Sequence, residues 1–195
     1  MLSRRGLLQA GGLWLAGLAV GGIGWSAEAG EVIEILMRSD PAGSHVVFDP
    51  IGLLVRPGQR VRWVNDGNNV HTATAYHPAN AQHPLRIPAA ASPWDSGYLV
   101  NPGDSFEVQL TVEGIYDYYC TPHEAAGMVG RIVVSRSNGG HPPAFELYPD
   151  DHGNPMWRKV PQAALRNFPT VEAILKNSSK LPTGEKSVTT KTGQY

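Results

Sequence analysis

Residues 118–130 read YYCTPHEAAGMVG, and this short stretch decides how the rest of the chain is interpreted. It contains the only cysteine, Cys120, followed by His123 three positions later and Met128 eight positions later. A thiolate, imidazole nitrogens and a weakly bound thioether together suit copper in both of its common oxidation states. The stretch supplies one group of each kind and is therefore a candidate metal-binding turn.

A second imidazole has to come from another part of the chain. His71 is the favoured candidate, because it follows a predicted strand around Trp63, whose end can lie beside the Cys120 turn. His45, His77 and His83 are the alternatives. Of these, His77 and His83 lie in a long connection rather than at a strand end, which makes a fixed ligand position less natural for them.

Each residue of the turn also has a simpler interpretation. A free cysteine is most often a small buried hydrophobic residue, and methionine commonly fills gaps in a core. A histidine in a turn is commonly a surface residue. The metal site is favoured because the three residue types occur at these offsets and because residues 1–29 resemble an export signal, as described below.

Most of the chain between Glu31 and Val134 is composed of short β-prone segments separated by Gly, Pro, Asn and Asp. The predicted strands are Val32–Met37, Leu53–Val55, Val61–Val64, Ser105–Val112, Tyr116–Tyr119 and Arg131–Val134. No sustained helical period occurs among them, and many short strands at this spacing predict an all-β sandwich.

Two segments exceed a minimal sandwich. Residues 72–93 form a long connection rich in Ala and Pro, and loops of this length are often functional. Residues 136–177 form a C-terminal extension with too many apolar side chains for a free tail, so we expect it to pack on the domain. Within it, 162–166 and 171–176 are predicted short helices.

The two ends of the chain have different compositions. Residues 1–29 combine Arg4 and Arg5, a weakly hydrophobic Gly-rich run and the small-x-small site at 27–29, which predicts a twin-arginine-type signal peptide. The segment is also long enough to remain as a membrane anchor if it is not cleaved. Residues 30–135 would then be the folded domain, and 178–195 a disordered tail.

Composition restricts the function further. A formal net charge of −1 gives no indication of nucleic-acid binding, which usually requires a basic face. A single cysteine excludes an internal disulfide, although a periplasmic or extracellular location is oxidising. A free thiol in such a compartment is chemically exposed unless a ligand occupies it.

The turn, with Tyr118-Tyr119 before it and Val129-Gly130 after it, resembles the copper-binding end of plastocyanins, pseudoazurins and halocyanins. The Cys-x2-His-x4-Met spacing is that of plastocyanin. Framework similarity extends over about residues 32–134 and includes Leu54-Val55, Pro57-Gly58, residues 61–65, Asn69-Val70-His71 and residues 94–97. This resemblance implies a cupredoxin-like Greek-key sandwich in which His71, Cys120, His123 and Met128 hold one type 1 copper ion.

The resemblance also implies roles for neighbouring residues. Plastocyanins have Asn after the first histidine ligand, whereas this chain has Thr72. The Thr72 backbone N–H remains able to bond the Cys120 sulfur, and Thr121 is expected to lie beside the ligands as well. Electrons would pass through the edge of His123, within a flat apolar surface that includes Ala125, Ala126 and Gly127.

The implied function is a periplasmic or exported carrier of single electrons between transient redox protein partners. We expect a monomer that associates with membrane only if the N-terminal segment is retained. An enzyme is not expected, because the chain has neither His-x-His pairs nor a second cysteine for further copper. The alternatives are a copper delivery or storage protein and an accessory subunit of a redox enzyme.

Overall fold

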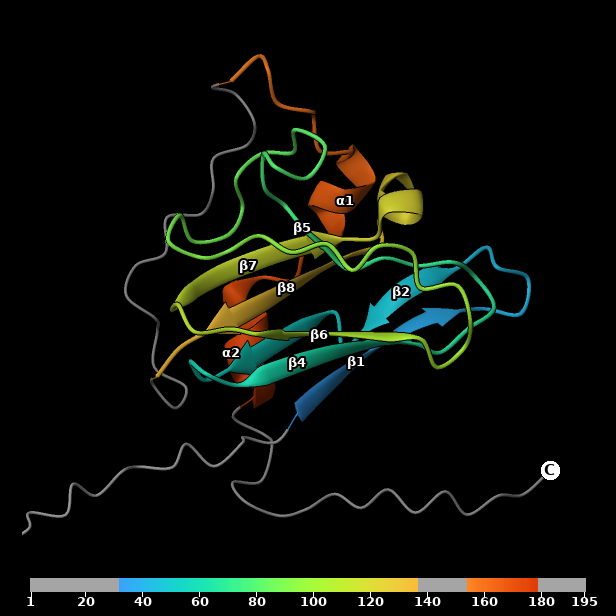
Figure 1. The fold of residues 1–195 in the computed structure, drawn as a ribbon, viewed down its shortest axis with the longest axis horizontal. Coiled ribbons are helices and arrows are strands. Elements are labelled where there is room, and N and C mark those ends of the chain that lie inside the picture. The colour runs from blue at the N-terminus through green and yellow to red at the C-terminus, as the bar shows by residue number, and fades with distance from the viewer. Residues whose placement is uncertain (1–31, 137–153, 179–195) are drawn as a thin grey trace, which may run out of the picture.

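The computed structural model describes residues 32–136 and 154–178 (Figure 1). The predicted signal peptide and the predicted tail beyond Ser178 lie outside the described residues. Among the helices of the described ranges, none has the length and apolar character needed to cross a bilayer.

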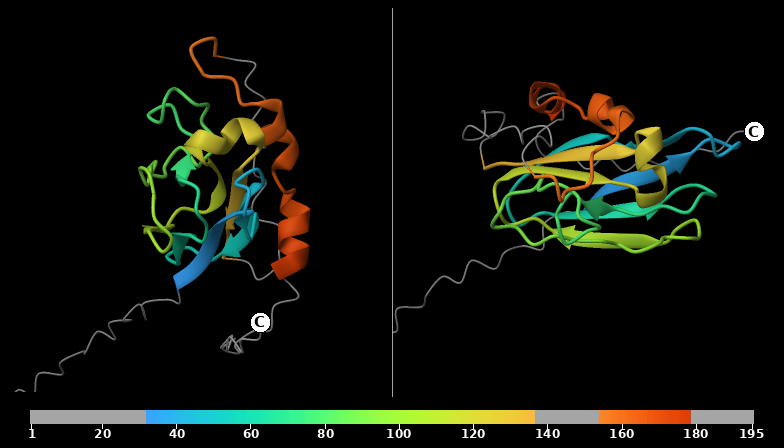
Figure 2. Two further views of the ribbon diagram at one scale, coloured as in Figure 1. Left: turned by 90° about the vertical axis from the view of Figure 1, so that its right-hand side faces the viewer. Right: turned by 90° about the horizontal axis from the view of Figure 1, so that it is seen from above.

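Two mixed four-stranded sheets face each other (Figures 1 and 2). In the first sheet the order is β2 (Val46–Asp49), β1 (Val32–Ser39), β4 (Arg60–Asn65) and β6 (Ser105–Gln109). In the second sheet the order is β3 (Gly52–Val55), β8 (Val129–Val134), β7 (Gly114–Tyr119) and β5 (Thr74–Ala75). The β1–β4 and β3–β8 pairs are parallel and the other pairs are antiparallel. The predicted all-β sandwich is confirmed.

The main core lies between the sheets and follows from side-chain alternation along the strands. In β4, Val61, Trp63 and Asn65 are buried, whereas the residues between them are only partly buried. Successive side chains of a strand point to opposite faces, so every second position reaches the core. Trp63 packs there against Trp94 and Tyr118.

The second sheet is covered on its outer face as well, because every residue of β7 and β8 is buried. Tyr116 and Tyr118 belong to the main core. Tyr119, which alternates with them, belongs to a separate apolar cluster on the outer face. This outer cluster consists of Tyr76, Tyr119, Val129, Val160 and Ala164, with Leu165 and Phe168 packed against it.

Besides Tyr119 and Val129 of the second sheet, the outer cluster contains residues of two segments that a minimal sandwich lacks. One is the 72–93 connection, which contributes Tyr76, and the other is the C-terminal extension. The extension contains α1 (Gln162–Asn167) and α2 (Val171–Ser178), and both helices lie along the second sheet (Figure 2). The two predicted C-terminal helices are therefore confirmed. Gly52 of β3 permits close approach, since an added Cβ would lie 2.7 Å from Cγ1 of Ile174 in α2.

A buried ion cluster joins the 72–93 connection, the second sheet and the C-terminal extension. Asp117 of β7 is fully buried and accepts hydrogen bonds from Arg131 Nε at 2.7 Å and from Arg86 Nε at 2.9 Å. Arg131 Nη1 also donates to the Pro169 carbonyl at 2.9 Å. The ring of Phe168 lies under both guanidinium groups, 4.9 and 5.2 Å from their central carbons. The connection, the sheet and the extension are thus linked through one carboxylate.

The number and the bounds of the strands differ from the prediction in several places, and β7 and β8 begin two residues earlier than predicted, at Gly114 and Val129. β2 and β5 are not among the predicted strands, and a two-residue strand such as β5 is too short to show a period. The predicted strand at 105–112 ends at Gln109. Beyond it, Leu110 still bonds the segment before β4: its N–H donates to the Gln59 carbonyl at 3.0 Å, and its carbonyl accepts the Gly58 N–H at 2.6 Å.

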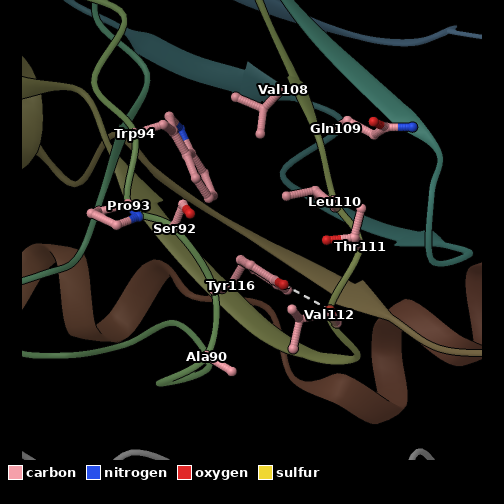
Figure 3. Close-up of a pocket in the computed structure, with 11 residues that line it drawn as sticks. Ala90, Ser92, Pro93, Trp94, Val108, Gln109, Leu110, Thr111, Val112 and Tyr116 are labelled. Atoms are coloured by element: carbon pink, nitrogen blue, oxygen red, sulfur yellow. Dashed lines mark hydrogen bonds between the residues drawn. The ribbon is translucent and has the colours of Figure 1, made fainter.

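A pocket of about 170 Å³ lies between residues 90–94 and the segment from Val108 to Val112 (Figure 3). Tyr116 lines it and donates a hydrogen bond to the Val112 carbonyl at 2.7 Å. Tyr116 is near the start of β7, whereas Cys120 follows its end. The pocket contains none of the candidate metal ligands.

Candidate metal centre

The turn after β7 is a short 3-10 helix, η1 (Thr121–Ala126). Pro122 lies in its first turn, where a missing N–H is tolerated, and Gly127 ends it in the left-handed region at φ 88°. Side chains three positions apart overlap along a 3-10 helix. The Cys-x2-His spacing therefore presents Cys120 and His123 on the same side of the turn.

His71 reaches the turn from another part of the chain. It forms an isolated antiparallel bridge with Leu99, in which each backbone N–H donates to the other residue's carbonyl, at 3.1 and 2.8 Å. The buried Asn65 amide at the end of β4 donates to the Leu99 carbonyl at 3.1 Å and to the Asn69 carbonyl at 2.9 Å. These bonds fix the segment that carries His71.

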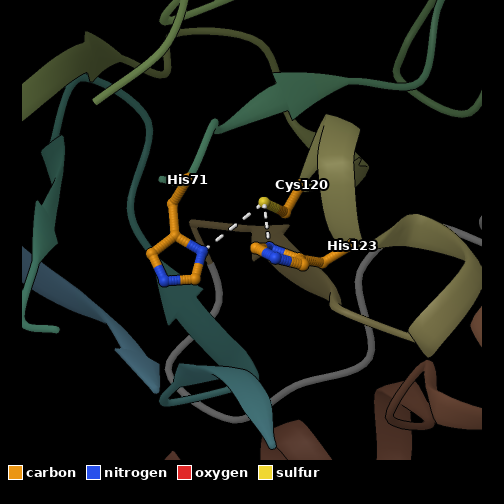
Figure 4. Close-up of side chains that lie close together, drawn as sticks. All are labelled: His71, Cys120 and His123. Carbon is orange, nitrogen blue, oxygen red and sulfur yellow. Dashed lines mark hydrogen bonds between the residues drawn. The ribbon is translucent and has the colours of Figure 1, made fainter. Parts of the chain in front are cut away.

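The three candidate donor groups converge (Figure 4). Cys120 Sγ lies 3.6 Å from His71 Nδ1 and 3.3 Å from His123 Nδ1. One donor atom from each residue lies within 4.8 Å of the others, and the described residues contain no other such cluster of His, Cys, Asp or Glu. Nitrogen and sulfur atoms at this separation are close enough to share one ion.

Met128 lies at the end of the same turn and is 1% exposed. Its N–H donates to the His123 carbonyl at 3.1 Å, and its carbonyl accepts the Cys120 N–H at 3.0 Å. Two backbone bonds thus tie the methionine to both of the other candidate ligands of the turn.

Thr72 links the His71 segment to the turn. Its N–H donates to Cys120 Sγ at 3.3 Å, and its hydroxyl oxygen accepts the Thr121 N–H at 2.8 Å. The Thr72 and Thr121 hydroxyls also lie 3.1 Å apart. A threonine at this position therefore joins the two segments through its side chain, although plastocyanins have asparagine there.

Burial determines the charge states of the donors. It raises the pKa of the Cys120 thiol to about 11, opposed by the hydrogen bond from the Thr72 N–H. Burial, followed by the proximity of His123, lowers the pKa of His71 to about 4. Burial also lowers the pKa of His123. Both imidazoles are therefore neutral near pH 7 and present lone pairs, while a buried thiolate requires a cation beside it. This donor set fits copper.

One further contact orients the His71 ring. Ser39 Oγ lies 2.9 Å from His71 Nε2. When Nε2 carries the hydrogen and donates it to Ser39, the Nδ1 lone pair faces the sulfur of Cys120. Nothing in the sequence around Ser39, 32 positions before His71, indicated this contact.

The other histidines considered as ligands lie elsewhere. His45 is exposed, and His77 Nδ1 accepts the Ala79 N–H at 3.1 Å. His83 is fully buried, with Nε2 3.2 Å from a carboxylate oxygen of Glu124. None of the three belongs to the cluster around Cys120.

The surface expected around His123 is only partly open. His123 is partly exposed, and Ala125 and Ala126 are exposed. Gly127 is buried, because α1 lies directly on it: a Cβ at this position would be 2.4 Å from Nδ2 of Asn167.

Comparison with known proteins agrees with this geometry. Residues 35–135 match the family model described as copper binding proteins, plastocyanin/azurin family. The chain belongs to this family. It is 31% identical over 119 residues to the chloroplastic plastocyanin of Tetradesmus obliquus, covering 61% of this chain and 77% of that protein. It is 32% identical over 108 residues to plastocyanin A'/A'' of Nicotiana tabacum, covering 53% of this chain and 100% of that protein.

A solved structure of pseudoazurin from Methylobacterium extorquens AM1 aligns with a TM-score of 0.42 at 24% identity, covering 55% of this chain and 77% of that one. Membership of a copper-binding family identifies copper as the metal for which this plastocyanin/azurin-type centre is built. His71, Cys120, His123 and Met128 are positioned as in a type 1 copper site.

Proposed function

We propose that this protein carries single electrons between redox partners, with His71, Cys120, His123 and Met128 as the ligands of one copper ion. The observation that carries the proposal is the convergence of His71 Nδ1, Cys120 Sγ and His123 Nδ1 within 4.8 Å of one another. When bound there, copper supplies reversible one-electron chemistry between Cu(I) and Cu(II).

The contribution of the protein is to hold the donor atoms in one geometry. His71 is fixed through Leu99 and Ser39, and Cys120 through Thr72 and Met128. All of these bonds are made by the polypeptide itself, and in this proposal they hold the donor atoms in place. A site that is already arranged changes little when its charge changes, which favours fast electron transfer over chemistry on a substrate.

The route for electrons in this proposal is the partly exposed edge of His123. Ala125 and Ala126 beside it are small and exposed, and in this proposal they keep the surface around His123 flat and apolar. Small contact areas suit the weak and short-lived complexes of redox proteins. Gly127 lies under α1 and therefore falls outside this surface.

The proposed setting is the periplasm or the outside of the cell. Residues 1–29 would act as a twin-arginine-type signal, 30–135 would form the copper domain and 136–177 the extension packed on it. The proposal includes a mature monomer with transient redox partners and no substrate site. Retention of the N-terminal segment would attach the same domain to a membrane.

The visible spectrum of the copper-loaded protein tests the function. We expect an intense blue thiolate-to-copper band, a stoichiometry of one copper and a reversible potential. Cys120→Ser should abolish the band, whereas His77→Ala, which changes a histidine outside the cluster, should retain both the band and the stoichiometry. A colourless protein that binds only Cu(I) would instead indicate copper delivery or storage and would overturn the carrier.

A further inference from the structure

Glu124 is a buried carboxyl group that the proposed function does not use. It directly follows His123 and is 3% exposed, although its turn lies at the surface. Tyr76 donates its hydroxyl to Glu124 Oε1 at 2.8 Å, and His83 Nε2 lies 3.2 Å from Oε2. Carboxylates are rarely buried unless they are paired, so these contacts account for its position.

Both partners of Glu124 belong to the 72–93 connection. Their own positions are fixed, since His83 Nδ1 lies 2.7 Å from the Asn80 carbonyl and the His83 ring stacks on Tyr119 at 4.3 Å between centroids. The Tyr76 ring lies 4.6 Å from that of Tyr119. The connection therefore presents two fixed polar groups to one side of η1.

The C-terminal extension contacts the end of the same helix. Nδ2 of Asn167, the last residue of α1, donates to the Gly127 carbonyl at 2.9 Å. This approach requires a glycine, since a Cβ at residue 127 would lie 2.4 Å from that nitrogen and 3.2 Å from the Ala163 carbonyl. The contact is one residue before Met128.

The residues that make these contacts and the proposed ligands lie on different sides of η1. Along a 3-10 helix, residues three apart share a side. Cys120 and His123 are on the side of the metal site, whereas Glu124 and Gly127 are on the side that faces the connection and α1. The turn is consequently held on the side away from the metal site. The contacts are at Glu124 and Gly127, which adjoin the proposed ligands His123 and Met128.

We propose that Glu124 and Asn167 are positioning residues of the copper centre, which hold the turn from Cys120 to Met128 between the 72–93 connection and the C-terminal extension. This inference rests on the proposed function for the identity of the ligands. It assigns a role to both of the segments that exceed a minimal sandwich.

Two single substitutions and their combination test the proposal. Tyr76→Phe removes only the hydroxyl that bonds Glu124, and Asn167→Leu removes the amide donor while keeping a branched side chain of similar size. Tyr116→Phe is the matched control for the first, because it removes a hydroxyl bonded to the Val112 carbonyl near the start of β7. Asn177→Leu, at an exposed position of α2, is the control for the second.

The first measurement is amide hydrogen exchange in the copper-free protein. The Gly127 N–H bonds the Glu124 carbonyl and the Met128 N–H bonds the His123 carbonyl, so both report opening of the turn. Loss of one hydrogen bond should accelerate their exchange about fivefold. The double variant should show roughly the product of the two single effects. Neither control should accelerate these amides beyond any change in global stability.

The second measurement is the energy of the thiolate-to-copper bands in the loaded protein. These bands should shift in Tyr76→Phe and Asn167→Leu, and remain in place in both controls. Unchanged exchange at Gly127 and Met128 together with an unshifted spectrum would overturn the positioning role. If the wild-type protein showed no thiolate-to-copper band, the proposed function would be wrong. The hydrogen-exchange result could still be interpreted, because it is measured on the copper-free protein.

Discussion

The backbone N–H of Thr72 donates a hydrogen bond to the sulfur of Cys120 at 3.3 Å, joining residues 48 positions apart. The Thr72 hydroxyl adds a second connection by accepting the Thr121 N–H at 2.8 Å. One threonine thus holds the segment of His71 against the segment of Cys120 with both its backbone and its side chain.

Thr72→Val tests the contacts of the Thr72 hydroxyl, which lies 2.9 Å from the Thr74 hydroxyl and accepts the Thr121 N–H. The substitution keeps the shape and the N–H to sulfur bond, but leaves the Thr121 N–H without its acceptor. We expect the free energy of unfolding to fall by about 1–3 kcal/mol in a urea titration, with the blue band retained. Thr111→Val, at an exposed position, should change stability by under about 0.5 kcal/mol. Equal losses in both variants would contradict this role.

Met128→Leu tests the proposed weak sulfur ligand. Removal of the thioether should leave copper bound by the other three residues and raise the reduction potential, because Cu(II) loses a donor more than Cu(I) does. Voltammetry measures the change, in which each tenfold shift in the ratio of the two copper affinities corresponds to about 59 mV. An unchanged potential would exclude Met128 as a ligand.

Asp117→Asn tests the buried ion cluster. Loss of the carboxylate leaves the Arg86 and Arg131 guanidinium groups inside the protein without their shared counter-charge, and we expect a loss of about 3–5 kcal/mol on chemical denaturation. The matched control is Asp49→Asn. Asp49 pairs with Arg38 at 3.0 Å with both side chains 49% exposed, so its loss should be below about 1 kcal/mol. Similar values for the two variants would show that the cluster contributes no more than a surface pair.

Phe168→Ala tests how the extension is attached. The ring covers Arg86, whose Nη1 has no hydrogen-bond acceptor among the described residues, and also Arg131. We expect thermal and urea unfolding to report a loss of about 2 kcal/mol from apolar burial and cation–π contact. Met156→Ala, in the same extension but at a side chain 70% exposed, should have little effect. Unaltered stability in Phe168→Ala would mean that the extension is held by other contacts.

Acid should destabilise the copper-free protein through His71. Its pKa is about 4 in the folded state against 6.5 for the free side chain, so the unfolded chain binds more protons between these values. The stability contributed by the neutral ring is present above pH 6.5 and is lost as the pH falls toward 4, by at most about 3 kcal/mol. Urea titrations across this range should show a shallower pH dependence for His71→Gln, whereas His45→Gln, at an exposed histidine, should follow the wild type.

Local patterns predicted the parts of the molecule that depend on local rules. The alternation around Trp63 identified β4. The three-residue offset between Cys120 and His123 identified the turn, because residues three apart lie on the same side of a short 3-10 helix. The two C-terminal helices were likewise visible in their start signals. Each of these features depends on residues within one or two turns of one another.

The contacts that fix the turn from behind could not be predicted in the same way. Glu124 in a turn has the sequence character of a solvated residue, and its partner His83 lies 41 positions away in a segment without a period. Ser39, which contacts His71 from 32 positions away, likewise belongs to no sequence motif that would indicate the contact. The Glu124–His83 pair depends on how the 72–93 connection packs on the second sheet, and the Ser39–His71 pair on how the end of β1 meets the His71 segment. The strand periods contain no information about either contact.

The bare α-carbon of Gly127 has a consequence for relatives of this chain. A helix can rest on this corner only while the corner has no side chain, so a homologue with alanine or a larger residue there has to seat any C-terminal helix elsewhere or do without one. The amino acid at position 127 therefore predicts, from sequence alone, whether the C-terminal extension of a longer homologue packs on this turn in the same way.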